Sequence, residues 1–77
     1  MNEVDKELDV KGLNCPMPLL KAKKTLNDME AGMILRVLAT DPGSERDFEV
    51  FARQSGNTLL DSNKSDGVYC YYLRKKN

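Results

Sequence analysis

Hydrophobic residues recur with two different periods along the chain, and the change of period predicts six secondary-structure elements. Four segments are rich in apolar, β-branched or aromatic residues, or alternate polar with apolar ones, as β-strands do: 7–10, 33–40, 58–60 and 68–74. Two segments place apolar residues three and four positions apart, as amphipathic helices do: 19–30 and 44–55. In chain order the predicted pattern is βαβαββ.

Both predicted helices have a defined apolar side. In the first helix this side, which Leu20 widens, consists of Leu19, Ala22, Leu26 and Met29. In the second helix it consists of Phe48, Phe51 and Ala52. A glycine follows each helix, and Asp66-Gly67 is a strong signal for a hairpin between the last two strands.

Right-handed crossovers would place both helices on the same face of one sheet. We therefore predict an α/β (α+β) fold, a two-layer sandwich in which two helices cover one face of a four-stranded mixed sheet. With 77 residues, the chain is long enough for one domain, 1–77, that buries roughly 60% of its unfolded surface.

The charge balance excludes several classes of partner. Twelve basic and twelve acidic residues give a net charge of zero, so no overall field draws the chain toward nucleic acid or a membrane surface. No apolar run approaches membrane-spanning length, and the acidic segment 1–9 lacks the apolar core of a signal peptide. We expect a cytoplasmic protein with no membrane contact and no direct binding to nucleic acid.

The chain has two cysteines, Cys15 and Cys70, and no histidine. The absence of histidine excludes Cys-His nucleophilic catalysis and the usual zinc-binding sets, apart from uncommon sets of cysteine and carboxylates, so we expect no metal. Because the cysteines do not form a CxxC pair, a dithiol mechanism has no resolving cysteine nearby in sequence. A single thiol without a neighbouring base suits a carrier better than a hydrolase.

Cys15 stands where the first helix is predicted to begin. Pro16 fits the first helical position, Pro18 fits the first turn, and Cys15 becomes the N-cap residue or its neighbour. Here the positive end of the helix dipole would lower the thiol pKa, with the N–H groups of Met17 and Leu19 directed toward the sulfur. The sequence therefore predicts a reactive thiol on a rigid strand-to-helix corner.

The segment Asp9-x-x-Gly12-Leu13-x-Cys15-Pro16-x-Pro18 resembles the signature of the TusA/SirA/YedF family of small sulfur carrier proteins. The resemblance extends from about Leu8 to Lys75 in the same element order. Its further matches are Lys21-x-x-Lys24, Gly32, Thr40-Asp41-Pro42, Arg46-Asp47, Gly56 and Asp66-Gly67.

The resemblance implies a sheet order of 1-2-4-3, with the last strand antiparallel to its hairpin partner. It also implies that Cys15 accepts sulfane sulfur from a cysteine desulfurase or a rhodanese-like donor and holds it as a persulfide. A downstream sulfur-relay protein would then receive the sulfur, often for 2-thiouridine in tRNA, whereas other relatives serve sulfur oxidation, molybdenum-cofactor supply or selenium metabolism. Such a chain works as a monomeric sulfurtransferase-type relay rather than a stand-alone enzyme, and it needs no cofactor besides the covalent persulfide.

The candidate site residues fall into three groups around this thiol. Cys15 is the catalytic residue. The motif-supporting residues are Asp9, Gly12, Pro16 and Pro18. The candidate docking residues for partner proteins are Met17, Lys21, Lys24 and Arg46. Met17 departs from the glutamate that some family members carry at this position, which leaves the acceptor open.

Other interpretations of these residues remain open from the sequence. The lysines of the first helix also fit a simple solvated face, and Cys70 fits the core or the sheet surface. Tyr69 and Tyr71 share a strand face that could stack on a partner. Two other functions remain alternatives: a regulatory protein-interaction module in which Cys15 is not catalytic, and nucleic-acid binding by the sheet.

Overall fold

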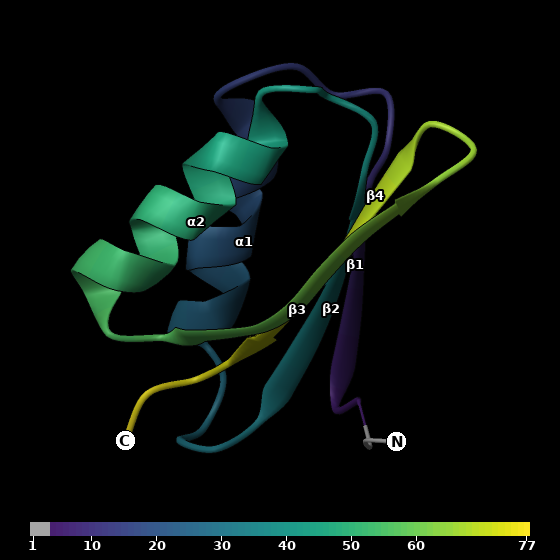
Figure 1. The fold of residues 1–77 in the computed structure, drawn as a ribbon. Helices are drawn as coiled ribbons and strands as arrows, with labels where there is room; N and C mark the ends of the chain where they lie inside the picture. The colour runs from purple at the N-terminus through teal and green to yellow at the C-terminus, as the bar shows by residue number, and fades with distance from the viewer. Residues whose placement is uncertain (1–3) are drawn as a thin grey trace.

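The computed structural model describes residues 4–77 and contains the six predicted elements in the predicted order (Figure 1). Their bounds are β1 Lys6–Val10, α1 Met17–Asn27, β2 Ile34–Ala39, α2 Ser44–Ser55, β3 Thr58–Ser65 and β4 Val68–Arg74. Among these residues, no helix is both long enough and apolar enough to cross a membrane.

The four strands form one mixed sheet with the order β1-β2-β4-β3. β1 runs parallel to β2, whereas β4 is antiparallel to both of its neighbours. Both helices cover the same face of the sheet (Figure 1). The predicted two-layer sandwich and its sheet order are confirmed.

The core lies between the helices and the inner face of the central strands. In β2, Leu35, Val37 and Ala39 are buried, and the residues between them are half-buried. In β4, the Tyr71 ring stacks on the Phe48 ring of α2 with a centroid distance of 4.5 Å. Because Tyr69 is also buried and stacks beside Tyr71, the prediction that these two tyrosines could stack on a partner is wrong: their face belongs to the core.

The first helix is shorter than predicted, and its buried side is narrower. It begins at Met17 with Pro16 as its N-cap, and it ends at Asn27 rather than near Glu30. The N–H groups of the next two residues bond to carbonyls three positions back, which tightens the chain into a turn. Leu20 is 49% exposed, so its predicted place in the buried stripe is wrong, because Ala22 and Leu26 already fill the side that faces the sheet.

The second helix and the final hairpin match their sequence signals. α2 begins at Ser44, and Gly56 ends it in the left-handed conformation with a φ of 87°. In the hairpin turn, Asp66 and Gly67 both have positive φ, 54° and 80°, as a type I′ turn requires. The Ser44 hydroxyl lies 2.6 Å from the buried Tyr71 hydroxyl, a contact that ties the start of α2 to the centre of the sheet.

Candidate functional site

The loop that carries Cys15 connects β1 to α1 and is fixed to the end of β2. Gly12 has a φ of 85°, a conformation that favours glycine. Its N–H donates a 2.9 Å hydrogen bond to the Thr40 side-chain oxygen, and the Leu13 N–H donates to the Val10 carbonyl. The loop is therefore held against the β2–α2 connection, where Asp41 lies.

Cys15 is exposed and directly precedes the N-cap of α1. This places the thiol beside the helix start, as predicted, although the helix begins one residue later than expected. The Met17 N–H donates a 2.9 Å hydrogen bond to the Asn14 carbonyl, so the prediction that it is directed toward the sulfur is wrong.

A carboxylate from the second helix contacts the thiol. The Cys15 Sγ donates a hydrogen bond to the Asp47 Oδ2 at 3.3 Å. Asp47 lies in the first turn of α2, and its N–H bonds to the Gly43 carbonyl, which keeps the residue within that turn. The packing of the two helices on one sheet face therefore brings together residues that are 32 positions apart in the sequence.

Asp47 raises the pKa of the Cys15 thiol above its ordinary value, chiefly through this hydrogen bond, and partial desolvation adds to the effect. The negative charges of Asp47 and Asp41 contribute in the same direction. Deprotonation would break the hydrogen bond and would place a thiolate beside two carboxylates. The predicted lowering of the Cys15 pKa is therefore wrong, because the neighbouring carboxylates favour the protonated thiol.

Cys15, Asp41 and Asp47 each offer one donor atom, and these atoms all lie within 4.8 Å of one another. Such spacing is close enough for a metal ion, but the set joins a soft thiol with two hard carboxylates. Cys15 Sγ lies at hydrogen-bond distance, 3.3 Å, from Asp47 Oδ2, with the thiol as the donor. We interpret the cluster as a thiol hydrogen-bonded to a carboxylate, with a second carboxylate nearby, rather than as a metal site.

Like Gly12, the other three motif-supporting residues shape the backbone around the thiol. The Asp9 Oδ1 accepts a 3.0 Å hydrogen bond from the Lys11 N–H, and Asp9 forms an ion pair with the same lysine. The backbone hydrogen bond is the main reason why the pKa of Asp9 is lowered. Pro18 is buried in the first turn of α1, and Pro16 is the N-cap of that helix. Asp9 and Pro18 therefore act on the turn and the helix, and neither contacts the sulfur.

The candidate docking residues on α1 form an exposed stripe that starts next to Cys15. Helical spacing aligns its members, Met17, Leu20, Lys21 and Lys24, and all four are exposed. Met17 and Leu20 are 42% and 49% exposed, so apolar surface lies closest to the thiol and lysines lie beyond it. Leu20, which the sequence had assigned to the core, belongs to this stripe.

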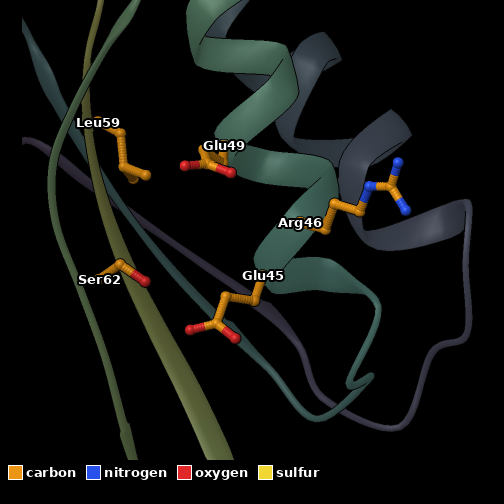
Figure 2. A pocket seen from close by; sticks show the side chains of 5 residues that line it. All are labelled: Glu45, Arg46, Glu49, Leu59 and Ser62. Carbon is orange, nitrogen blue, oxygen red and sulfur yellow. The ribbon is translucent and has the colours of Figure 1, made fainter.

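Arg46 lies on α2, apart from this stripe in the sequence. It borders a shallow hollow of about 350 Å³ between α2 and β3, which is lined by Glu45, Arg46, Glu49, Leu59 and Ser62. Figure 2 shows the two glutamates extending toward β3, whereas the Arg46 side chain extends away from Leu59 and Ser62. Arg46 is exposed, and its guanidinium points away from the hollow.

The second thiol lies in a different environment. Cys70 alternates with the core-facing Tyr69 and Tyr71 on β4, so it lies on the sheet face that carries no helix. Cys70 is only 8% exposed, and the Arg36 Nε contacts its sulfur at 3.5 Å. Both cysteines are free, and the predicted place of Cys70 at the core or sheet surface agrees with this position.

The sequence did not indicate the role of Asp47 at the thiol. It offered the residue's place in a first helical turn, where acidic residues are common because of the helix dipole, and its place in the Arg46-Asp47 match to the family. Neither signal placed the carboxylate at the thiol. The signal that could have identified it is the predicted fold itself. Because both helices begin at the same end of the sheet, their first turns face each other across the two loops (Figure 1).

The fold and the thiol corner define a small α+β protein whose chemistry centres on one exposed cysteine. A family model described as "Sulfurtransferase TusA" matches residues 6–75. The chain therefore belongs to the TusA family.

Curated relatives and a solved structure support this assignment over nearly the whole chain. The "Sulfur carrier protein TusA" of Allochromatium vinosum is 52% identical over 97% of this chain and 99% of its own length. The protein of the same name from Pseudomonas entomophila is 42% identical over 94% of this chain and 90% of its own length. The crystal structure of a SirA-like protein from Desulfitobacterium hafniense has a TM-score of 0.81 at 27% identity, covering 94% of this chain and 99% of that one.

Proposed function

We propose that this protein is a sulfur carrier that accepts sulfane sulfur as a persulfide on Cys15 and passes it to an acceptor protein. The observation that carries the proposal is the free, exposed Cys15 thiol at the corner before α1, in a chain of the TusA family. The relatives named as sulfur carriers support this role.

The transfer can be written with balanced atoms and electrons. The Cys15 sulfur attacks the outer sulfur of a donor persulfide, R–S–SH, so that a new S–S bond forms and the donor's S–S bond breaks. The bonding electron pair leaves with the donor sulfur, which takes up the proton lost from Cys15 and becomes R–SH. No external oxidant is needed, because the donor persulfide is reduced as the Cys15 thiol is oxidised. The second transfer is the same reaction, with Cys15 persulfide as donor.

A relay role suits the protonated resting state of the thiol. Since Asp47 raises the pKa of Cys15, only a small fraction of the thiol is ionised at neutral pH. A thiol in this state exchanges sulfur slowly until a partner brings the reacting sulfur into position. We propose that positioning by partners drives the exchange, with no cofactor besides the covalent sulfur itself.

The exposed stripe of α1 is the proposed docking surface for these partners. Met17 and Leu20 would contact an apolar patch beside the partner's reactive sulfur, and Lys21 and Lys24 would face acidic residues at its edge. Arg46 would extend the basic surface across α2. The proposed donor is a cysteine desulfurase or a rhodanese-like protein, and the proposed acceptor is a sulfur-relay protein. One destination that fits is tRNA thiolation in the cytoplasm.

Intact mass spectrometry after incubation with a cysteine desulfurase and cysteine tests the proposal. We expect a gain of one sulfur atom in the wild type and in Cys70→Ser, and no gain in Cys15→Ser. Circular dichroism should show that both variants fold. If the sulfur appears in Cys15→Ser, or if the wild type never gains one, the proposed function is wrong. A Cys15→Ser variant that keeps full biological activity would instead favour the interaction-module alternative.

A further inference from the structure

Two carboxylates lie beside the Cys15 sulfur. Asp47 contacts it at 3.3 Å, and the donor atoms of Cys15, Asp41 and Asp47 lie within 4.8 Å of one another. The Oδ2 of Asp41 is buried and has no hydrogen-bond partner within the described residues. Across residues 4–77 the ion pairs are Lys11–Asp9 and Arg36–Glu7, so neither carboxylate at the thiol forms an ion pair with a cation.

This arrangement makes the charge of the reaction partner important. In bulk water, two unit charges about 5 Å apart interact strongly enough to change the probability that they meet by roughly fourfold. Opposite charges raise this probability, and like charges lower it. Two carboxylates act together on any group that approaches Cys15. Lys21 and Lys24 lie further along α1 and would offset part of this field. Allowing for that offset and for salt, we expect a cationic reagent to be favoured over an anionic one by about tenfold.

We propose that Asp47, supported by Asp41, determines which partners exchange sulfur with Cys15: those with a cationic group beside the reacting sulfur are favoured, and small anionic thiols, disulfides and persulfides are disfavoured. The inference rests on the proposed function for the reaction that Cys15 performs. It adds that sulfur carried on Cys15 exchanges slowly with anionic low-molecular-weight sulfur compounds. It further requires the donor and the acceptor to present a cation to the two carboxylates.

Two symmetrical disulfides of opposite charge serve as probes: cystamine, a dication, and 3,3′-dithiodipropionate, a dianion. In each reaction the Sγ–S bond forms, the probe's S–S bond breaks, and the proton of Cys15 passes to the leaving thiolate. The reaction is followed by mass spectrometry in a Cys70→Ser background, so that a single thiol reports. The cation-to-anion rate ratio is divided by the same ratio for a neutral cysteine peptide, which corrects for the different leaving groups.

The variants separate a local effect from a change in net charge. Asp47→Asn removes the contacting carboxylate, and Asp47→Glu keeps it. Glu49→Gln is the matched control, because it removes one charge from the same helix on the side that faces β3 (Figure 2). We expect a corrected ratio of about ten for the protein with Asp47, for Asp47→Glu and for Glu49→Gln, and a fall of at least threefold in Asp47→Asn. High salt should reduce the ratio toward one.

Two results would overturn the inference: a corrected ratio near one with Asp47 present, or an equal fall in Asp47→Asn and Glu49→Gln. These results are independent of sulfur loading from a desulfurase. Failure of the proposed function would show as a wild-type protein that gains no sulfur while its charge preference persists. Failure of the inference would show as normal loading without any charge preference.

Discussion

The two cysteines of this chain occupy opposite chemical environments. Cys15 is exposed, and its sulfur donates a hydrogen bond to the carboxylate of Asp47. Cys70 is buried on the sheet, and its sulfur is contacted by the guanidinium of Arg36. A cation beside a thiol is the usual setting of a reactive cysteine, yet here the thiol with the cation is the covered one.

Accessibility, rather than a lowered pKa, is therefore the property that marks Cys15 as the proposed carrier thiol. A group that transfers sulfur between proteins must be reached by large partners. Cys15 satisfies this requirement, because it lies on a loop corner at the edge of the molecule. The neighbouring carboxylates raise the pKa of Cys15 and so favour its protonated form. Because thiols react through their thiolates, this lowers the reactivity of the free thiol. The largest effects should therefore come from burial and docking, and smaller ones from the charges around the sulfur.

The strongest test of the comparison is the relative labelling of the two thiols in the native protein. At pH 9, iodoacetamide should modify Cys15 about a hundredfold faster than Cys70. A buried thiol reacts only after local opening, and an opening that costs about 3 kcal/mol slows the reaction to this extent. Peptide mapping by mass spectrometry measures both rates in one sample. Equal rates would show that burial does not protect Cys70.

Reversal of the α1 charges should have the next largest effect. The double variant Lys21→Glu/Lys24→Glu should slow transfer from a protein donor by about tenfold, because rim charges mainly set the association rate. Its alkylation by iodoacetamide should change by less than about twofold, since the lysines lie away from the sulfur along the helix. The double variant Arg74→Glu/Lys76→Glu reverses two charges elsewhere and should transfer normally. An equal loss in both double variants would assign the effect to net charge.

Removal of the contacting carboxylate should produce a smaller change with a defined sign. Asp47 favours the protonated thiol, so Asp47→Asn should lower the pKa of Cys15 toward the ordinary value of about 8.5. The midpoint of the alkylation rate should therefore move to lower pH, and the rate at pH 7.5 should rise several-fold. The pH profile of iodoacetamide alkylation measures this. A midpoint that stays in place or moves upward contradicts the assigned role of the hydrogen bond.

The smallest expected effect is that of Asp41. Its charge acts in the same direction as that of Asp47 but contributes least to the raised pKa of Cys15. Asp41→Asn should shift the alkylation midpoint to lower pH by less than Asp47→Asn does. The same pH profile provides the measurement, with Glu45→Gln as a control on the β3 side of α2 (Figure 2). A larger shift for Asp41→Asn would reverse the order of the two carboxylates.

Much of the fold was predictable because local signals agreed with one another. Gly56 has the left-handed conformation that ends α2, and the Asp66-Gly67 turn has the φ values of a type I′ hairpin. Periodicity predicted the buried sides of both helices, with Ala22 and Leu26 in α1 and Phe48 and Phe51 in α2. It failed at Leu20, because an apolar residue at the edge of a helical stripe can face either the core or a partner, and its sequence position does not decide between them.

The electrostatics of the site could not be predicted in the same way. The helix-start argument for Cys15 used only residues next to it in sequence, whereas Asp47 is 32 positions away. Its contact depends on how two helices settle on one sheet face, and a distance of about 3 Å decides whether a carboxylate dominates a pKa. The tyrosines of β4 illustrate the same limit, since alternation predicted their shared face but not that α2 covers it.

The central claim is that Cys15, rather than Cys70, carries the transferred sulfur. The most direct measurement is peptide-level mass spectrometry of the wild-type protein after loading with a cysteine desulfurase and cysteine, with alkylation to trap persulfides. We expect one additional sulfur on the peptide that contains Cys15 and none on the peptide that contains Cys70. Additional sulfur on the Cys70 peptide, with an unmodified Cys15 peptide, would contradict this claim.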